Sequence, residues 1–410
     1  MTSAETTALS WTNWVGNQSF RPAEIVVAHS EDDVIATVQR AARAGKRLRA
    51  PGSGHSFTPI VETDGILLDA SALSGVIATD AGALTATAWS QTKVADFGPA
   101  LWERGLGLSN QGDIDAQAIA GAIATATHGS GVNMKNFSAS LVGARLIDGM
   151  GETRDINARD HADILPALQT AIGTLGVMTQ VTLKVSRAYK LHERIAVMHV
   201  DAVLERWDEL IGAYRHFSFF WMTSAASAKL YNLDAPADHC YVKLYQEFPA
   251  DAPAPTPGDH ERYDRAYKIY TQVYDPNFHE MEYFLPLADS KEIFKAQRKL
   301  MLARPQEAVF PMEVRFCAAD DAWLSPNYQR ANIVVSVSGM PGTDYWPYLK
   351  RCDALFREHK GRPHWGKLHF MTPSRLADLF PHYEDFRRVR KQFDPRGTFL
   401  NPHLRDLFGD

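Results

Sequence analysis

Two runs of small residues within the first 131 positions constrain this chain more than any other feature of its sequence. The first is Gly52-Ser53-Gly54-His55-Ser56-Phe57, which follows a strand expected within residues 46–50. The second covers residues 121–131 and reads GAIATATHGSG. Small side chains let backbone N–H groups approach a diphosphate closely. Each run alone has a plain alternative, a glycine-rich turn or a close helix–strand crossing. Together they favour a large cofactor that carries phosphate.

Neither run matches the dinucleotide-binding Rossmann motif. That motif needs a third glycine where Phe57 stands, and it needs a helix directly after the loop, which the sequence does not predict. The second run is too rich in Gly and Ala to predict a packed core helix. We therefore expect two cofactor-binding loops that differ from a Rossmann nicotinamide site.

The organisation of the chain changes twice. Its 410 residues, 45% of them hydrophobic, suffice for a large core and more than one domain. Strands and helices alternate to residue 185. An example is the strand Ile25–Ala28, followed by Ser30 as helix cap and Gly45 as helix end. Aromatic residues and Met become frequent over residues 186–372, and residues 373–410 predict a helix followed by an irregular segment. We expect three parts with these bounds.

Charge and cysteine content exclude several classes of protein. The net charge is −5, so a nucleic-acid or anionic-membrane partner is not predicted. Cys240, Cys317 and Cys352 are widely spaced and form no metal or redox motif. The N-terminal residues lack the pattern of a secretory signal, and no apolar run is long enough to span a membrane. We expect a cytoplasmic protein, a monomer or small homo-oligomer, with no metal site.

A third group of residues suggests chemistry on a hydroxylated substrate. Glu313 and Arg315 share one face of a predicted strand, and Lys367 ends the motif His364-Trp365-Gly366-Lys367. A carboxylate between two cations can position a polyol, accept a proton and stabilise negative charge. The alternative is a surface ion pair with a solvated lysine.

A series of segments in a fixed order then carries a family resemblance that covers nearly the whole chain. The segments are residues 49–57, 110–115, 119–131, 172–177, 282–283, 313–315, 362–367 and 394–401. The sequence resembles the vanillyl-alcohol-oxidase (PCMH-type) flavoproteins, and among them the sugar-1,4-lactone oxidases and the alditol oxidases. The resemblance implies an α+β fold. A PCMH-type FAD-binding domain of two subdomains would be joined to an α+β cap domain over an antiparallel sheet, with the C-terminal segment returning to the FAD domain.

The resemblance also assigns residues to the cofactor. His55 matches the histidine that carries FAD through a covalent bond to the 8α-methyl carbon. Other positions match the diphosphate loop and further FAD contacts: Pro51, Gly52, Ser53, Gly54, Ser56, Gly112, Asp113, Gly121, Ala122, Ala124, Thr125, His128, Gly129, Val177 and His364. For His128, a ring satisfied by backbone groups near the cofactor is the more ordinary interpretation.

Further positions match the substrate side. Glu313 and Arg315 match a pair that binds substrate hydroxyls, and Lys367 matches a lysine near flavin N5. Ser336 and Ser338 lie on the strand where relatives often carry a histidine, and His369 matches the lactone group. We assign these last three to substrate binding.

The implied function is an FAD-dependent oxidase acting on a CH–OH group of an aldono-1,4-lactone, such as L-gulono- or D-arabinono-1,4-lactone. Hydride would pass to flavin N5, and O₂ would reoxidise the flavin to give H₂O₂. Gly112 would leave O₂ a path. Lys367, Glu313 or a water could take the hydroxyl proton. The alternatives are oxidation of an alditol or another sugar or nucleoside alcohol, a dehydrogenase that uses cytochrome c or a quinone, and a non-catalytic flavin- or sugar-binding protein.

Overall fold

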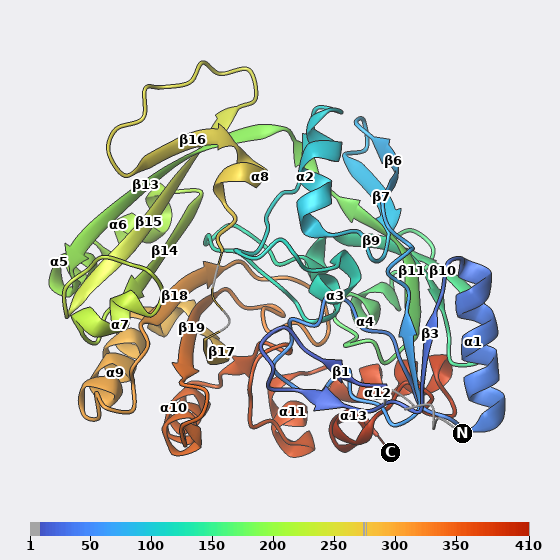
Figure 1. Cartoon of the computed structure of the whole chain (residues 1–410). Coiled ribbons are helices and arrows are strands. Elements are labelled where there is room, and N and C mark those ends of the chain that lie inside the picture. The colour runs from blue at the N-terminus through green and yellow to red at the C-terminus, as the bar shows by residue number, and fades with distance from the viewer. Residues whose placement is uncertain (1–8, 274, 276, 410) are drawn as a thin grey trace, which may run out of the picture.

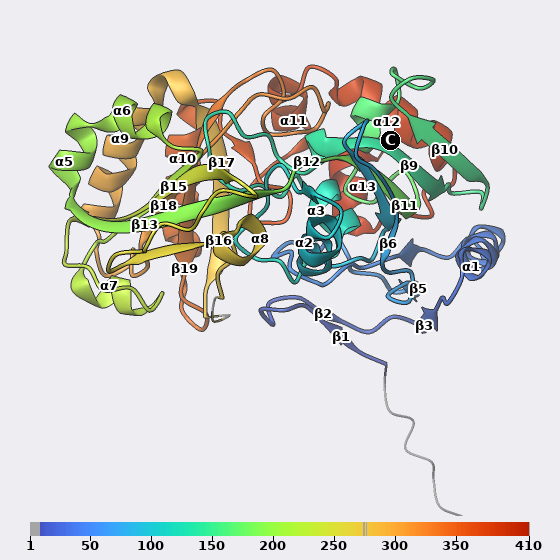
Figure 2. The ribbon, with the colours of Figure 1, turned by 90° about the horizontal axis from the view of Figure 1, so that it is seen from above.

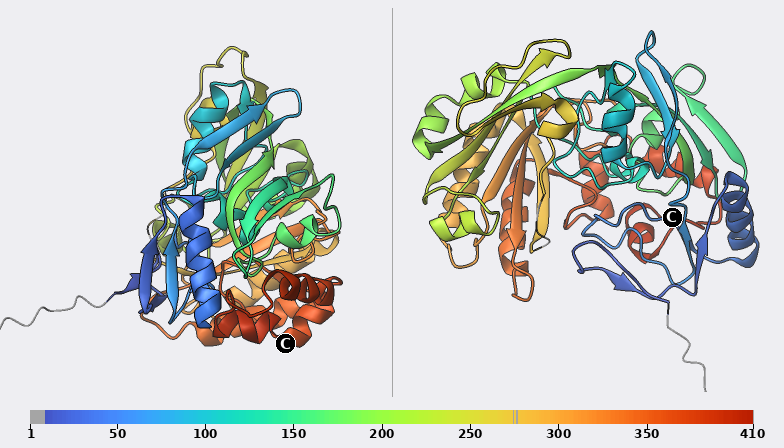
Figure 3. Two further views of the ribbon diagram at one scale, coloured as in Figure 1. Left: turned by 90° about the vertical axis from the view of Figure 1, so that its right-hand side faces the viewer. Right: turned by 45° about the horizontal axis from the view of Figure 1, so that its top comes forward.

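A computed structural model of the chain describes residues 9–273, 275 and 277–409. Helices and three larger sheets make up the fold, which confirms the predicted α+β class (Figure 1). In the right-hand view of Figure 3, the largest sheet and its helices occupy one side of the molecule, and the two smaller sheets occupy the other. No helix in the described residues is long and apolar enough to cross a bilayer.

The smallest of these sheets is parallel and lies near the N-terminus. Its strand order is β3 (Glu24–Val27), β5 (Ile66–Asp69), β4 (Leu48–Arg49). Helix α1 (Glu31–Ala44) packs against it through Val34, Val38 and Ala41. Ser30 and Asp33 form a capping box at its start, and Gly45 ends it in the left-handed conformation at φ 63°. The predicted helix and its cap residues are confirmed.

The second sheet is antiparallel, with five strands. Its order is β10 (Thr153–Asn157), β9 (Leu141–Ile147), β11 (Val177–Lys184), β7 (Thr85–Trp89), β6 (Val76–Asp80). Alternate residues of β11 are buried, as expected for a strand that covers a core with one face. Around this sheet lie the helices α2 (Val94–Trp102), α3 (Ile119–Ala124) and α4 (Leu165–Leu168).

Helix α3 corrects one prediction. The run that begins at Gly121 was expected not to form a packed core helix, yet Ile119, Ala122 and Ile123 of α3 are buried. The small residues have a packing reason. A Cβ on Gly52 would lie 3.3 Å from Ala118 Cβ, so the first small-residue loop lies directly against the start of this helix. Close approach between two backbones outweighs the low helix propensity of glycine here.

The third and largest sheet has eight antiparallel strands. Its order is β16 (Glu261–Arg265), β13 (Tyr189–His199), β15 (His239–Pro249), β14 (His216–Trp221), β18 (Met312–Cys317), β19 (Asn332–Gly339), β17 (His279–Pro286), β20 (Arg362–Pro363). One face carries the helices α5 (Val200–Glu205), α6 (Trp207–Ala213), α9 (Ser290–Leu302) and α10 (Trp346–Glu358), as Figure 2 shows. Trp207 of α6 contacts the rings of Phe219, Phe294 and Phe316 in this layer. The opposite face is free to line a site.

Shorter elements connect these layers. They are β1 (Trp11–Thr12), β2 (Ser19–Phe20), β8 (Leu106–Gly107), β12 (Ser186–Arg187), α7 (Ala225–Lys229), α8 (Ala266–Ile269) and two 3₁₀ turns at Ser138–Ser140 and Leu287–Asp289.

The last three helices lie beside the N-terminal part of the chain. They are α11 (Pro373–Leu379), α12 (Tyr383–Phe393) and α13 (Pro402–Phe408), drawn in red in Figure 1. Leu48 N donates to Thr398 O at 2.8 Å, and Arg49 Nη1 donates to Phe399 O at 2.7 Å. Asn401 caps α13 by accepting from Leu404 N, and its Nδ2 donates to the carbonyls of Pro59 and Glu62.

We predict that Asn401→Ala lowers the free energy of unfolding by about 3 kcal/mol. The buried Asn401 side chain makes three hydrogen bonds, each worth about 1 kcal/mol. Denaturant titration followed by tryptophan fluorescence measures the loss. Thr372→Ala is the matched control, because Thr372 caps α11 from an exposed position, so about 1 kcal/mol is expected. Equal losses in the two variants would contradict the prediction.

Candidate active site

A cavity lies between the two small-residue loops. Its lining includes Gly52–Ser56, Ala118, Gly121–Ala122 and Val177, together with Phe399 from the C-terminal segment. Arg49 also lines it, and among the described residues no Asp or Glu does. A positive, glycine-lined cavity fits the diphosphate of a dinucleotide.

Ser53 fixes the shape of the first loop. Its Oγ accepts hydrogen bonds from Lys93 Nζ at 2.6 Å and Ala118 N at 2.8 Å, and donates to Ala116 O at 2.7 Å. These contacts tie the loop to the start of α3 and leave neighbouring backbone N–H groups for a ligand. Lys93, which sequence reasoning missed, places a cation beside the loop.

A second cavity adjoins the first. The two cavities share His55, Ser56, Gln117 and Thr125 in their linings. His55 therefore stands where they meet. Trp14 stacks on its ring, with centroids 5.0 Å apart, and His55 Nδ1 is buried without a hydrogen-bond partner. Burial, together with the charges of Lys367 and Lys93, lowers the pKa of His55 to about 4, so the imidazole is neutral.

The wall of the second cavity facing His55 is the open face of the large sheet. Because side chains alternate along a strand, Glu280 and Glu282 of β17, Ser336 and Ser338 of β19, and Glu313 and Arg315 of β18 share that face. The register pairs Glu282 with Ser336 and Ser336 with Glu313. The sequence prediction that Glu313 and Arg315 share a strand face is confirmed, but the two residues are largely buried and do not form a surface pair.

A row of charged contacts crosses this wall. Arg315 Nε donates to Glu313 Oε1 at 2.7 Å, and Arg315 Nη2 donates to Asp113 Oδ2 at 3.2 Å. Lys243 Nζ also donates to Asp113 Oδ2, at 3.3 Å. Burial raises the pKa of Glu313 above its ordinary value against the opposing charge of Arg315, and Asp113 and Glu280 add to the rise. A carboxyl of this kind can exchange a proton near neutral pH.

Lys367 lines the same cavity, but it lies on the segment that follows β20 and not on the large sheet. Its ammonium forms an ion pair with Glu280 and lies 4.9 Å from the centre of the Phe57 ring. Ser336 Oγ also donates to Glu280. Glu280 therefore fixes the lysine, and sequence reasoning missed it. Its two-residue spacing from Glu282 on a strand was the available signal.

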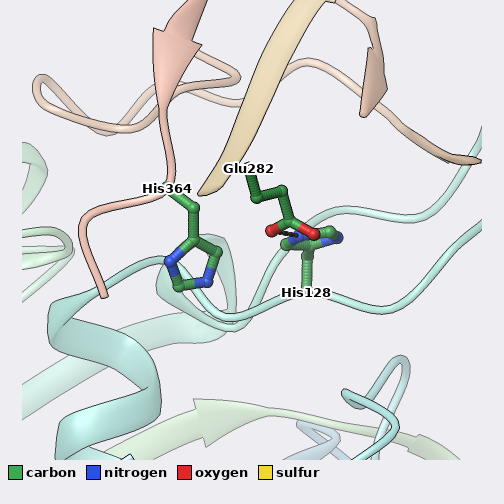
Figure 4. Close-up of side chains that lie close together, drawn as sticks. All are labelled: His128, Glu282 and His364. Atoms are coloured by element: carbon green, nitrogen blue, oxygen red, sulfur yellow. Dashed lines mark hydrogen bonds and ion pairs between the residues drawn. The ribbon is translucent and has the colours of Figure 1, made fainter. Parts of the chain in front are cut away.

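Figure 4 shows a second buried pair, His128 and Glu282, beside His364. His128 Nε2 lies 2.8 Å from Glu282 Oε1, and His128 Nδ1 lies 2.8 Å from Gly129 O. Burial opposes protonation, but the Cys317 sulfur and the Glu282 carboxylate raise the pKa of His128 to about 10. With an oxygen acceptor at each ring nitrogen, His128 is an imidazolium paired with Glu282.

His364 behaves differently. Its Nδ1 accepts a hydrogen bond from Gly366 N at 3.0 Å, and its ring lies 5.7 Å from that of His128. Burial lowers the pKa of His364 to about 3. The charge of Glu282 acts in the opposite direction, but its effect is smaller. A neutral His364 thus lies next to a charged His128 on the cavity wall.

The structure distributes the residues singled out from the sequence as follows. The first cavity is lined by Gly52, Ser53, Gly54, His55, Ser56, Gly121, Ala122, Ala124, Thr125 and Val177, and the second by His55, Ser56, Gly112, Asp113, Thr125, His128, Glu313, Arg315, His364 and Lys367.

The other five residues are outside both linings. Pro51 is buried and accepts a long hydrogen bond from Gln91 through its carbonyl, and Gly129 contacts His128. Ser336 and Ser338 bond to the lining residues Glu280 and Tyr231. His369 packs against Trp365 and His403, outside both linings.

Comparisons with known proteins give the family. A family described as D-arabinono-1,4-lactone oxidase matches residues 181–239 and 236–407, and an FAD binding domain matches residues 22–157. The chain is 34% identical to L-gulono-1,4-lactone dehydrogenase of Mycobacterium tuberculosis, over 97% of this chain and 99% of that protein. It is 25% identical to L-gulonolactone oxidase of Bos taurus, over 97% of each chain. It is 26% identical to alditol oxidase of a Streptomyces species, over 97% of this chain and 98% of that protein.

The chain therefore belongs to the D-arabinono-1,4-lactone oxidase family and carries an FAD-binding domain. A solved structure of cholesterol oxidase from Brevibacterium sterolicum is similar with a TM-score of 0.83, at 14% identity over 98% of this chain and 96% of that one. At that identity the likeness shows the fold alone. The resemblance to FAD-dependent oxidoreductases of sugar lactones and alditols is confirmed.

We predict that His128 stays protonated between pH 6 and 9. Its folded-state pKa is raised from 6.5 to about 10, so its contribution to stability is complete below pH 6.5 and is lost as pH rises toward 10. The ¹⁵N shifts of the His128 ring nitrogens report its charge. In Glu282→Gln the pairing charge is gone, and a neutral ring is expected at pH 8. A neutral His128 in the wild type at pH 7 would contradict the prediction.

Proposed function

We propose that this chain uses FAD to oxidise a CH–OH group of an aldono-1,4-lactone, with O₂ as the electron acceptor. The observation that carries this proposal is the position of His55. It joins a glycine-lined cavity suited to a dinucleotide to a second cavity that is lined by Glu313, Arg315 and Lys367. Bound FAD supplies a hydride acceptor at its flavin N5.

The division of the chain supports the same proposal. Residues 1–185 supply the lining of the first cavity except Phe399, and we propose that they hold FAD. Residues 186–372 supply the open face of the large sheet, and we propose that they cap the flavin and select the substrate. The segment 373–410 completes the FAD side through Phe399.

Glu313 and Arg315 are suited to binding adjacent hydroxyl groups. The guanidinium can donate to a hydroxyl or lactone oxygen, and the carboxylate can accept from a hydroxyl proton. Their mutual bond at 2.7 Å fixes both groups before a substrate arrives. Fixed polar groups of this kind orient a substrate without reorganisation at the moment of reaction.

The arrangement also separates the roles of acid and base. Lys367 is positioned by its ion pair with Glu280, and we assign to it the hydrogen bond that stabilises negative charge on the reacting oxygen. Glu313 has a raised pKa, and one of its oxygens accepts from Arg315. We propose that the other oxygen of Glu313 accepts the proton of the substrate hydroxyl. Of the three acceptors that the sequence left open, Lys367, Glu313 and a water, this selects Glu313.

His55 is the residue that we propose to bind FAD covalently. A neutral imidazole whose Nδ1 has no hydrogen-bond partner is a competent nucleophile, and Trp14 fixes its plane. Attachment there would hold the flavin across the junction of the two cavities.

Acid precipitation tests the attachment. We expect the wild-type pellet to stay yellow in trichloroacetic acid, whereas His55→Ala releases its flavin completely into the supernatant. Trp14→Phe keeps an aromatic neighbour and serves as control, with at least half of the flavin retained. Wild-type protein that loses its flavin in acid would contradict the covalent link.

Anaerobic mixing with lactones tests the activity. We expect L-gulono- or D-arabinono-1,4-lactone to bleach the 450 nm flavin band of the wild type, and Lys367→Met to bleach at least 100-fold more slowly while it stays yellow. Lys229→Met, which changes an exposed lysine, is the control at wild-type rate. No bleaching by any aldono-1,4-lactone would contradict the proposed function, and bleaching by an alditol or a nucleoside instead would favour those alternatives.

A second candidate concerns the electron acceptor. The relative with 34% identity is named a dehydrogenase, whereas relatives at 25–26% are named oxidases. Gly112 lines the second cavity, and a Cβ there would lie 3.1 Å from Thr127 Cγ2, so the glycine keeps that space open. We take this as support for O₂. Reduced protein that ignores air but rapidly reduces a quinone dye would favour the dehydrogenase.

A further inference from the structure

Lys243 is a buried cation that no sequence motif singled out. It lies on β15, and 4% of its side chain is exposed. Its Nζ lies 5.9 Å from the centre of the Phe220 ring. Burial of a lysine is unfavourable unless an anion compensates it, so its position calls for a partner.

That partner is Asp113, which lines the second cavity, where we propose that the substrate binds. Lys243 lines a third cavity, and Asp113 lines the second cavity. Phe220 and Tyr231 line both cavities. Lys243 therefore contacts Asp113 from behind the wall of the second cavity, in whose lining it is not included.

A single oxygen of Asp113 connects Lys243 to the substrate-facing groups. Asp113 Oδ2 accepts from Lys243 Nζ at 3.3 Å and from Arg315 Nη2 at 3.2 Å. Arg315 in turn donates to Glu313 Oε1 at 2.7 Å. The Arg315 guanidinium is therefore shared between the carboxylates of Asp113 and Glu313. Its position depends on how strongly each carboxylate attracts it.

Lys243 offsets part of the negative charge of Asp113. When that offset is removed, the attraction of Asp113 for Arg315 strengthens and the guanidinium moves away from Glu313. A shift of one ångström in a substrate-positioning group is enough to weaken binding markedly.

We propose that Lys243 is a positioning residue for substrate recognition. It holds Asp113 so that Arg315 stays against Glu313, and it acts on the substrate only through these three residues. This inference rests on the proposed lactone oxidation and extends it to a residue outside the lining of the second cavity.

Lactone binding to the reduced holoenzyme tests the inference without turnover. The flavin is reduced with dithionite, and L-gulono-1,4-lactone is titrated by calorimetry under anaerobic conditions. We expect Lys243→Met to raise the Kd at least tenfold and Lys243→Arg to bring it back within threefold of the wild type. Flavin content and Tm report whether the variants are folded. Binding unchanged in folded Lys243→Met, or no rescue by Lys243→Arg, would overturn the role.

A double-mutant cycle covers the case in which Lys243→Met folds poorly. Asp113→Asn removes the charge that Lys243 compensates, so Lys243→Met combined with Asp113→Asn leaves no unpaired charge between them. We expect the double variant to bind the lactone within twofold of Asp113→Asn alone. A further tenfold loss would show that Lys243 acts by another route. If no lactone bleaches the flavin of the wild type, the proposed function is overturned, and this inference with it.

Discussion

The feature on which the rest of the structure depends is the pairing of buried charges on one face of the large sheet. Four carboxylates, those of Asp113, Glu280, Glu282 and Glu313, meet four cations, Lys243, Arg315, Lys367 and the imidazolium of His128, within the described residues. A buried charge without a partner would be strongly destabilising. The sheet meets this condition because its alternation places such residues on one side, while helices α5, α6, α9 and α10 cover the other side with apolar rings.

This balance separates two kinds of group around the cavity. The paired groups have fixed charges and fixed positions, whereas His55 and His364 are kept neutral by burial. Glu313 lies between these classes, because it has a cation partner and yet its pKa is raised. Pairs of titratable groups whose environments push their pKa values apart are typical of sites that move protons. This environment fits the role of proton acceptor that we propose for Glu313.

Much of the fold followed from local rules. The cap residues of α1 and the shared face of Glu313 and Arg315 follow from short-range chemistry and from the period of two along a strand. For the run that begins in helix α3, a close crossing that involves a helix was only the alternative interpretation, because its small residues are explained by contact with Gly52, which is far away in sequence. Lys243 was missed because its partner Asp113 lies 130 positions away, and local patterns carry no information about such a pair. Glu280 had a local signal in its two-residue spacing from Glu282, but its partner Lys367, which gives it a role, lies 87 positions away.

The lining of the first cavity has a consequence for how the protein is made. Arg49 and Phe399 both line it, and Arg49 donates to the carbonyl of Phe399 across 350 positions. The ribosome therefore has to reach Phe399 before this cavity can close. If FAD binds there, as we propose, flavin loading has to wait for that residue, and a nascent chain interrupted before it would hold an incomplete site.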